Sequence, residues 1–267
     1  MLYGASNTIW TVGGGKGGVG KSFVSSGLAI CLSKMGKSVT LVDLDLGGAN
    51  LHTCLGIKIP PLSISDLLVG RATYVKQLMT ETENPHLSFI GEYNDSLKIA
   101  NINSSERNRI KQALRSIPSR YVIVDLGAGT SESTIDFFNM ADRKLVVATP
   151  EPTSVENLYR FLKTAFYTTL LDTQIDKNVH DVINTAMSSR SDLGIQTPRD
   201  LVNYLNLNYP DIGRAIQAMI GDYKINLIIN QTRTKSDIEL GYGIKSVCHK
   251  YFGFEANYLG NIDHDNA

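Results

Sequence analysis

The stretch that decides the fold is GGGKGGVGKS, residues 13–22, which directly follows the apolar run TIWTV. Residues 15–22 satisfy the pattern G-x-x-x-x-G-K-[ST], in the expected context between a strand and a helix. Glycines let successive backbone N–H groups turn toward one phosphate, and the helix N-terminus adds partial positive charge. We therefore expect a nucleotide phosphate here, with Lys21 on the β- and γ-phosphates and the Ser22 hydroxyl on Mg²⁺.

Short apolar runs recur along the chain and alternate with longer helical patterns. The runs lack polar alternation, which is typical of strands buried on both faces of a parallel sheet. This order predicts an α/β fold, with a doubly wound, mostly parallel sheet flanked by helices and with ligands at the carboxyl ends of the strands. The expected strands are residues 8–12, 38–45, 87–91, 121–127, 144–150, 225–230 and 258–262.

The helical patterns predict one domain over residues 1–267 with an insertion. A helix is expected over residues 22–34, and another over 153–166, opening with the capping box TSVE. Short helices are expected within residues 55–84. Residues 171–223 are too long for a structureless loop, so we predict a helical insertion there, either a lid or partner surface or a cover for the sheet. The second helix is expected to bury Leu158, Phe161, Leu162 and Ala165.

Composition and charge fit an ordinary packed globule. The chain of 267 residues is 42% hydrophobic and 19% charged, with 26 basic and 26 acidic residues, so its total charge favours neither DNA nor an anionic membrane. Its three cysteines include no C-x-x-C pair, so neither a disulfide framework nor a chelating pair is indicated. We find no signal peptide and no apolar run of the roughly 18 residues that a membrane span needs, and expect a soluble, cytoplasmic protein.

A second lysine, Lys16, stands in the variable part of the loop. The segment KGGVGKS resembles the deviant Walker A signature of the ATPases typified by MinD, ParA, FlhG and the nitrogenase iron protein. The resemblance implies ATP or ADP and Mg²⁺ as cofactors. It also implies that Lys16 crosses a homodimer interface to the other subunit's phosphates and stabilises charge during phosphoryl transfer. The nucleotide-binding residues of the loop would be Gly15, Gly17, Gly18, Val19, Gly20, Lys21, Ser22 and Phe23.

Two later stretches carry the same resemblance. LVDLDLGGANLHTCLG, residues 41–56, resembles the family's switch I, in which Asp43 would lie near Mg²⁺ and its waters and Asp45 would orient or deprotonate the attacking water. For Asp45 alone, forming a turn before the two glycines is an alternative. YVIVDLGAG, residues 121–129, resembles Walker B and switch II, in which Asp125 would accept a hydrogen bond from a Mg²⁺-bound water.

The resemblance also implies which residues in the second half of the chain would contact the adenine base. Asn230, at the end of INLIIN, would bind the adenine edge, and Arg233 would shield the ring. YLGNIDHDNA matches the family's late strand and base-side loop, although Asp263 stands where relatives often have proline.

Residues 148–163 and the switch GGANLH resemble the MinD and FlhG branch. This likeness implies an ATP-dependent dimer that places a flagellum or division site, with a protein activator or effector. The N-terminal MLYGASNT lacks the glutamine-containing segment of many FlhG proteins. Members also usually end in an amphipathic membrane helix, and this sequence stops after the last expected strand. The resemblance therefore implies a peripheral contact with the inner face of the cell membrane through a C-terminal segment outside this sequence.

Other functions remain open. A DNA-binding partition ATPase of the ParA type would need a local basic patch, and a small-molecule ATP-dependent enzyme would need a substrate pocket supplied by residues 171–223. An iron–sulfur carrier would need paired cysteines, which the sequence lacks. A pure scaffold would leave the two lysines and three aspartates unexplained. The candidates for the basic patch are Lys224, Arg233, Lys235, Lys245 and Lys250.

Overall fold

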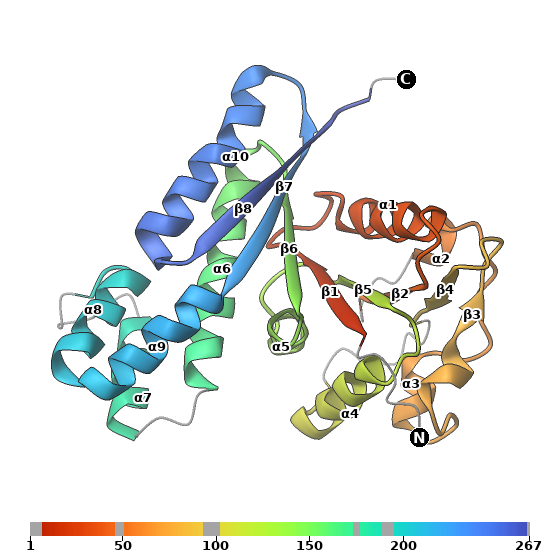
Figure 1. Cartoon of the computed structure of the whole chain (residues 1–267), viewed down its shortest axis with the longest axis horizontal. Coiled ribbons are helices and arrows are strands. Elements are labelled where there is room, and N and C mark those ends of the chain that lie inside the picture. The colour runs from red at the N-terminus through yellow and green to blue at the C-terminus, as the bar shows by residue number, and fades with distance from the viewer. Residues whose placement is uncertain (1–6, 46–50, 93–101, 173–176, 188–194, 266–267) are drawn as a thin grey trace. The chain divides into compact units, whose positions relative to one another are not determined.

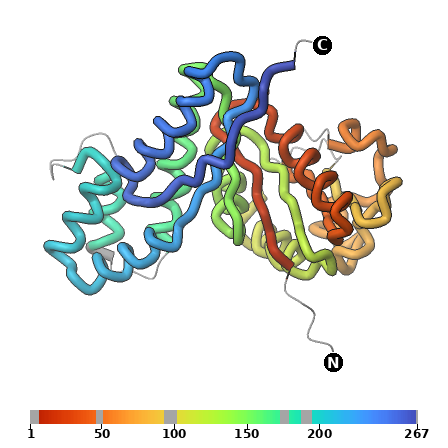
Figure 2. The backbone as a smooth tube through the Cα atoms, turned by 45° about the horizontal axis from the view of Figure 1, so that its top comes forward, coloured from red at the N-terminus to blue at the C-terminus, as the bar shows by residue number. Residues whose placement is uncertain are grey.

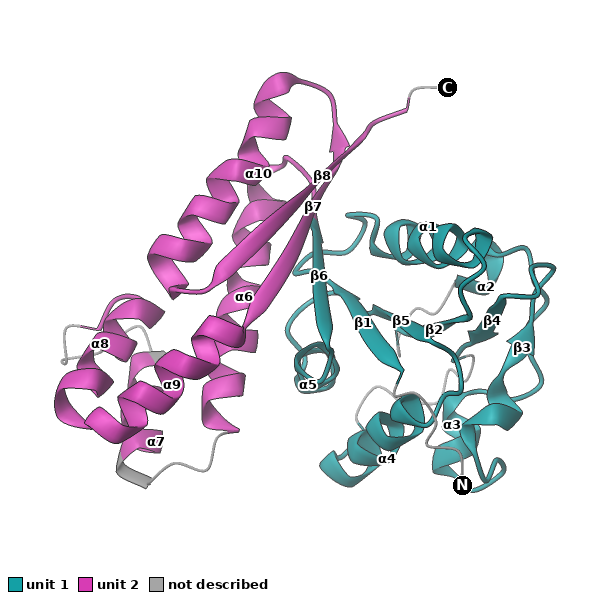
Figure 3. Cartoon of the chain, viewed as in Figure 1, with its two compact units in different colours: residues 1–147 teal, residues 148–267 magenta. Residues whose placement is uncertain are grey.

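The structure is a computed structural model that describes residues 7–45, 51–92, 102–172, 177–187 and 195–265 (Figure 1). The chain divides into two compact units, Met1–Val147 and Ala148–Ala267, which are coloured separately in Figure 3. None of the described helices is long and apolar enough to cross a membrane.

The first unit alternates strands and helices in chain order. Its strands are β1 (Thr8–Gly13), β2 (Val39–Leu44), β3 (Thr80–Glu81), β4 (Leu87–Ile90), β5 (Tyr121–Leu126) and β6 (Arg143–Ala148). Its helices are α1 (Lys21–Lys34), α2 (Leu51–Cys54), α3 (Ile64–Leu68), the 3₁₀ turn η1 (Val75–Leu78), α4 (Ser104–Arg115) and α5 (Glu132–Asn139).

The strands of this unit form a doubly wound sheet in the order β3-β4-β2-β5-β1-β6. All neighbouring pairs are parallel except β3 with β4. The helix α1 lies on one side of β1, β5 and β2, and α4 and α5 lie on the other (Figure 1). Every residue of β2 is buried, because both faces of the sheet are covered. The α/β prediction is therefore confirmed.

The register of the central strands brings their carboxyl ends together. Val12 of β1 lies opposite Asp125 of β5, and Asp43 of β2 lies opposite the same aspartate from the other side. Figure 2 shows the red β1 passing from this edge into α1. The edge formed by β1, β2 and β5 is thus where the loop meets Asp43 and Asp125.

The described residues of the second unit form a parallel strand pair and five α-helices. Its core includes a cluster of aromatic rings 4.9–6.2 Å apart between centroids, formed by Phe166, Tyr167, Tyr223, Phe252 and Phe254. Its elements are α6 (Pro152–Leu171), α7 (Lys177–Met187), α8 (Pro198–Asn208), α9 (Pro210–Asp222), β7 (Lys224–Thr232), α10 (Lys235–Val247), the π-helical turn η2 (Cys248–Phe252) and β8 (Glu255–Asp263).

The pairing of β7 with β8 contains two bulges. The register skips Leu259 on β8, and it skips Gln231 on β7, whose φ of 61° lies in the left-handed region. Each bulge leaves one residue without an opposite partner, so the ladder of backbone hydrogen bonds between β7 and β8 is interrupted twice.

The expected elements appear with small differences. All seven expected strands are present, and the two-residue β3 was not expected. The expected short helices correspond to α3 and η1, and the described part of residues 171–223 contains α7, α8 and α9. The single-domain organisation stays a prediction.

One detail of α6 was predicted wrongly. The helix begins at Pro152, with Glu151 as its N-cap, so TSVE is not a capping box. The Ser154 hydroxyl instead accepts a hydrogen bond from the Thr149 N–H at 3.0 Å. Proline already has the backbone angle and the missing N–H that suit a first helical residue, which moves the start one residue earlier. The predicted inward face is confirmed, because Leu158, Phe161, Leu162 and Ala165 are all buried.

Candidate nucleotide-binding site

The loop between β1 and α1 has the geometry of an anion site. Gly18 and Gly20 have φ angles of 78° and 93°, a region that other residues adopt only with strain. Gly20 is the N-cap of α1 and has no side chain to cap it, and the first turn of the helix contains no acidic residue. The N–H groups of that turn are therefore available to an incoming anion.

Close packing holds the base of this loop. A Cβ placed on Gly14 would lie 2.9 Å from the Val147 carbonyl oxygen, so only glycine fits there without movement. Val19 is also buried, which anchors the middle of the loop to the protein. The tight approach fixes the loop over the end of the sheet.

Lys21 lies under the loop, with 7% of its surface exposed. Its Nζ donates a hydrogen bond to the Lys16 carbonyl oxygen at 3.5 Å, which bridges the loop from inside. Burial lowers the pKa of the Lys21 ammonium, and the nearby carboxylates of Asp125 and Asp45 oppose that shift. The two carboxylates thus favour the protonated, positively charged form of Lys21, which can bind a phosphate.

Asp125 connects β5 to the first turn of α1. Its Oδ2 accepts a hydrogen bond of 2.6 Å from the Ser22 hydroxyl, while its buried Oδ1 has no partner in the described structure. Burial raises the pKa of Asp125 to about 6, against the hydrogen bonds from Ser22 and Ser25 and the charge of Lys21. Ser25 was not expected here, although its position one helical turn after Lys21 puts it on the same face.

Asp43 holds both ends of the segment that follows β2. Its carboxylate accepts hydrogen bonds from the N–H groups of Asp45 and Leu51, each at 3.1 Å. The side chain is 1% exposed, and burial raises its pKa to about 7, partly offset by these two bonds. Asp43 therefore joins the two ends of residues 46–50, which themselves lie outside the described residues.

Asp45 and the loop after β5 complete the site. A Cβ on Gly127 would lie 2.9 Å from Oδ1 of Asp45, so the carboxylate lies directly against this glycine. Gly129, with a φ of 90°, donates its N–H to the Gly14 carbonyl oxygen at 3.3 Å. The phosphate loop, the first switch and the second switch are thereby in contact.

The residues present fit a magnesium ion that arrives with a nucleotide. The Ser22 hydroxyl and the unpartnered Oδ1 of Asp125 are hard oxygen groups, the kind that Mg²⁺ or its water shell prefers. Over the described ranges, no group of three or more His, Cys, Asp or Glu side chains is placed to enclose a metal. This arrangement suits Mg²⁺, which keeps several waters and takes further oxygens from substrate phosphates.

Most of the expected site residues gather in the first unit, and two belong to the second. Asn230 is buried at the end of β7, next to the bulge at Gln231, and Arg233 is exposed before α10. The Arg233 N–H donates to the Asp237 carboxylate at 2.8 Å. Their contact with the base stays a prediction. In the first unit, Phe23 is 61% exposed beside the loop.

A family model and several curated relatives match parts of the chain. The family model described as "ParA: NUBPL iron-transfer P-loop NTPase" matches residues 5–183. The antiactivator FleN of Pseudomonas aeruginosa is 31% identical over 58% of this chain and 55% of its own length. The flagellum site-determining protein YlxH of Helicobacter pylori is 34% identical over 56% and 50%, and the septum site-determining protein MinD of that organism is 34% identical over 56% and 55%. The chain thus spans about half the length of these relatives.

Solved structures share the fold. MinD of Pyrococcus horikoshii, complexed with Mg-ADP, has a TM-score of 0.63 at 18% identity and covers 97% of this chain and 82% of its own. Apo McdA of Cyanthece has a TM-score of 0.64 at 16% identity and covers 97% and 86%. At such identities the likeness supports the fold alone. Because the family model matches more than half of the sequence, the chain belongs to the ParA family of P-loop NTPases.

Proposed function

We propose that this chain is a Mg²⁺-dependent ATP-hydrolysing switch that dimerises with ATP bound and regulates where a flagellum or division site is placed. The observation that carries the proposal is that the two-lysine loop and three switch aspartates gather on one sheet edge: Ser22 bonds Asp125, Asp45 lies near Lys21, and Asp43 lies beside Asp125. The names of YlxH and MinD, a flagellum and a septum site-determining protein, support the placement role.

The chain's own residues divide the work of hydrolysis. The loop N–H groups and Lys21 bind the β- and γ-phosphates, and Mg²⁺ held at Ser22 supplies charge neutralisation when bound. Asp45 accepts a hydrogen bond from the attacking water and directs its oxygen at the γ-phosphorus. The bond from that phosphorus to the β–γ bridging oxygen breaks, leaving ADP and inorganic phosphate. Asp43 keeps the first switch closed at both ends.

Lys16 has a different role in the proposal. Its carbonyl oxygen is held by Lys21 within the loop, and its side chain is half-buried. By the resemblance, the side chain reaches phosphates bound by a second copy of the chain. Dimerisation would then report that ATP is present, and hydrolysis would release the dimer.

The test is light scattering behind gel filtration on the Asp45→Ala protein, with Mg-ATP and separately with Mg-ADP. We expect a dimer with ATP and a monomer with ADP, since slow hydrolysis preserves the ATP state. A monomer in both nucleotides, with nucleotide binding intact by calorimetry, would contradict the switch and leave a monomeric ATP-dependent enzyme.

The proposed setting is cytoplasmic, with a peripheral contact on the inner face of the cell membrane and a protein activator or effector. These parts come from the MinD and FlhG resemblance. Fractionation of cells that express this protein tests them, with ATP or ADP added to the lysate. Recovery in the soluble fraction under both nucleotides would contradict the membrane contact.

A DNA-binding partition ATPase is the second candidate. The observation in its favour is that all five candidate basic residues of the second unit are exposed. Retention on non-specific duplex DNA with ATP, lost with ADP and weakened steeply by salt, would support this candidate over the first. The residues are Lys224, Arg233, Lys235, Lys245 and Lys250.

A further inference from the structure

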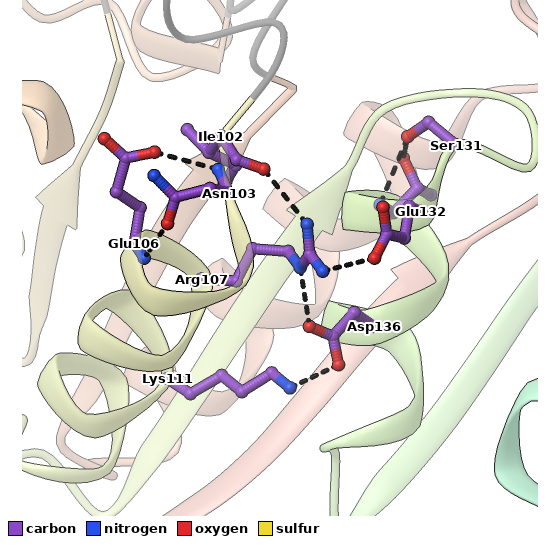
Figure 4. A network of polar contacts seen from close by, with 9 residues as sticks. Ile102, Asn103, Glu106, Arg107, Lys111, Ser131, Glu132 and Asp136 are labelled. Atoms are coloured by element: carbon purple, nitrogen blue, oxygen red, sulfur yellow. Dashed lines mark hydrogen bonds and ion pairs between the residues drawn. The ribbon is translucent and has the colours of Figure 1, made fainter. Parts of the chain in front are cut away.

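A buried arginine on α4 connects this helix to the start of α5 (Figure 4). The Arg107 side chain is 8% exposed, and its Nε donates to the Asp136 carboxylate at 2.9 Å. Its Nη2 pairs with Glu132, and its Nη1 donates to the Ile102 carbonyl oxygen at 3.0 Å. One guanidinium therefore fixes two acidic side chains of α5 and the backbone before α4.

Other contacts make this connection rigid. Lys111, one turn further along α4, pairs with the second oxygen of Asp136. On the other side, Asn103 and Glu106 form a reciprocal capping box, with hydrogen bonds of 2.8 and 3.0 Å, that fixes the first turn of α4. Arg107 thus projects from a capped turn, and its target Asp136 is held from two directions.

The anchored turn of α5 lies directly after the second switch. Ser131 caps α5 by accepting a hydrogen bond from the Thr134 N–H at 3.2 Å. Only Thr130 and this cap separate Glu132 from Gly129, whose N–H contacts the Gly14 carbonyl oxygen of the phosphate loop. The first turn of α5 is therefore joined to Gly129 through only two residues.

The ion pairs of Arg107 are better suited to positioning α5 than to raising the free energy of unfolding. Buried ion pairs are often replaced by apolar side chains of similar volume without loss of stability. A planar guanidinium that donates to two carboxylates and a carbonyl oxygen, however, fixes direction as well as distance between two helices, which apolar contacts do less sharply. The arrangement thus suits a site where the position of α5 must be held closely.

We propose that Arg107 is a positioning residue that acts through α5 to hold residues 127–130 in place against the phosphate loop. Its loss lowers the rate of phosphoryl transfer and leaves nucleotide affinity almost unchanged, because the loop N–H groups and Lys21 are untouched. This inference rests on the proposed ATPase function only in its kinetic part. Its structural part concerns the nucleotide-free chain.

The first experiment compares the kinetics of the wild-type chain with those of Arg107→Ala and Arg107→Lys. For Arg107→Ala we expect kcat to fall by about 10-fold with KM within about 2-fold, since small displacements far from the reacting atoms produce rate losses of this order or larger. Arg107→Lys keeps a cation near Asp136 and should recover part of kcat. A rise in KM with unchanged kcat would overturn the proposal.

The second experiment measures amide hydrogen exchange without nucleotide. Arg107→Ala and Glu132→Ala should speed exchange at residues 129–134. Glu132 is 78% exposed, so its removal does not threaten folding. The matched control is Arg115→Ala, because Arg115 at the end of α4 donates to the carbonyl oxygen of Met140, the C-cap of α5, at 2.7 Å and to Asp142 just beyond it at 2.6 Å. Its exchange at 129–134 should equal that of the wild type.

The outcomes separate the inference from the proposed function. If the wild-type chain hydrolyses no ATP, the ATPase proposal fails and the exchange experiment alone decides the role of Arg107. Exchange at 129–134 that stays at the wild-type rate in both variants would overturn the inference. Equal acceleration in Arg115→Ala would also overturn it, because the effect would then be general loosening of the helix pair.

Discussion

At the scale of single residues, the site combines one buried ammonium with carboxylates that burial alone would neutralise. Asp43 and Asp125 have pKa values raised to about 7 and about 6 by burial. Lys21 lies close enough to lower the second of these shifts. A bound nucleotide with Mg²⁺ would change this balance strongly, because it brings several new charges into the same space.

Removal of the Ser22 hydroxyl tests the predicted metal role. We expect Ser22→Ala to weaken ATP binding in the presence of Mg²⁺ by about 10-fold or more, because Mg²⁺ loses an oxygen ligand and Asp125 loses its 2.6 Å donor. Calorimetry with Mg²⁺ and with EDTA checks this. In EDTA, the wild-type and Ser22→Ala proteins should bind ATP with equal affinity. A loss of ATP affinity in Ser22→Ala that is the same with Mg²⁺ and with EDTA would contradict the metal role.

The raised pKa values also predict how stability depends on pH without nucleotide. Both carboxyls have folded-state pKa values above the ordinary 3.8, so the folded chain binds more protons than the unfolded chain between about pH 4 and 7. The free energy of unfolding should therefore fall as pH rises from 5 to 7.5. Urea titrations at both values measure it.

Two asparagine variants make this pH experiment specific. Asp43→Asn should reduce the difference between the two pH values, because the titrating carboxyl is gone. Asp142→Asn should leave it in place, because the pKa of Asp142 is lowered by Arg115 and its stabilisation is lost only at more acidic pH. An unchanged pH dependence in Asp43→Asn would contradict the assignment.

At the scale of helices and strands, the sequence predicted those elements that have a local pattern of their own. The strands were predictable because each is a continuous apolar run, and the phosphate loop because its glycines have fixed spacing. The strand β3 has only Thr80 and Glu81 and exists through its pairing with β4, so no local signal marks it. The network of Arg107 was equally hidden, since charged residues on two helices reveal no pairing until the fold brings them together.

Two glycines of α9 give a matched test of helix packing. A Cβ on Gly213 would lie 2.6 Å from the Asn206 Cα, whereas one on Gly221 would meet nothing within 4 Å. Gly213→Ala should destabilise the chain by about 1 to 3 kcal/mol, because the backbone of α8 must shift. Gly221→Ala should stabilise it by up to about 1 kcal/mol through helix propensity. Chemical denaturation measures both, and similar effects would contradict the close contact.

At the scale of the whole molecule, the proposed function is an equilibrium between a monomer and a dimer. We expect Lys16→Ala to bind ATP with nearly wild-type affinity and to remain monomeric, because the lost charge would act on the other subunit's phosphates. Lys21→Ala should bind no nucleotide at all. Calorimetry and light scattering on the same samples check both. A Lys16→Ala protein that still dimerised with ATP would contradict the crossing-lysine role.

A protein that dimerises only with ATP must not associate in its other states. The two bulges between β7 and β8 help to prevent such unwanted association. A flat, regular strand offers neighbouring chains a template for unlimited sheet growth. In β8 the skipped Leu259 breaks that template, although its side chain is 56% exposed. A high local concentration of such molecules would therefore not by itself start sheet growth along β8, and the proposed nucleotide-dependent dimer would not have to compete with it.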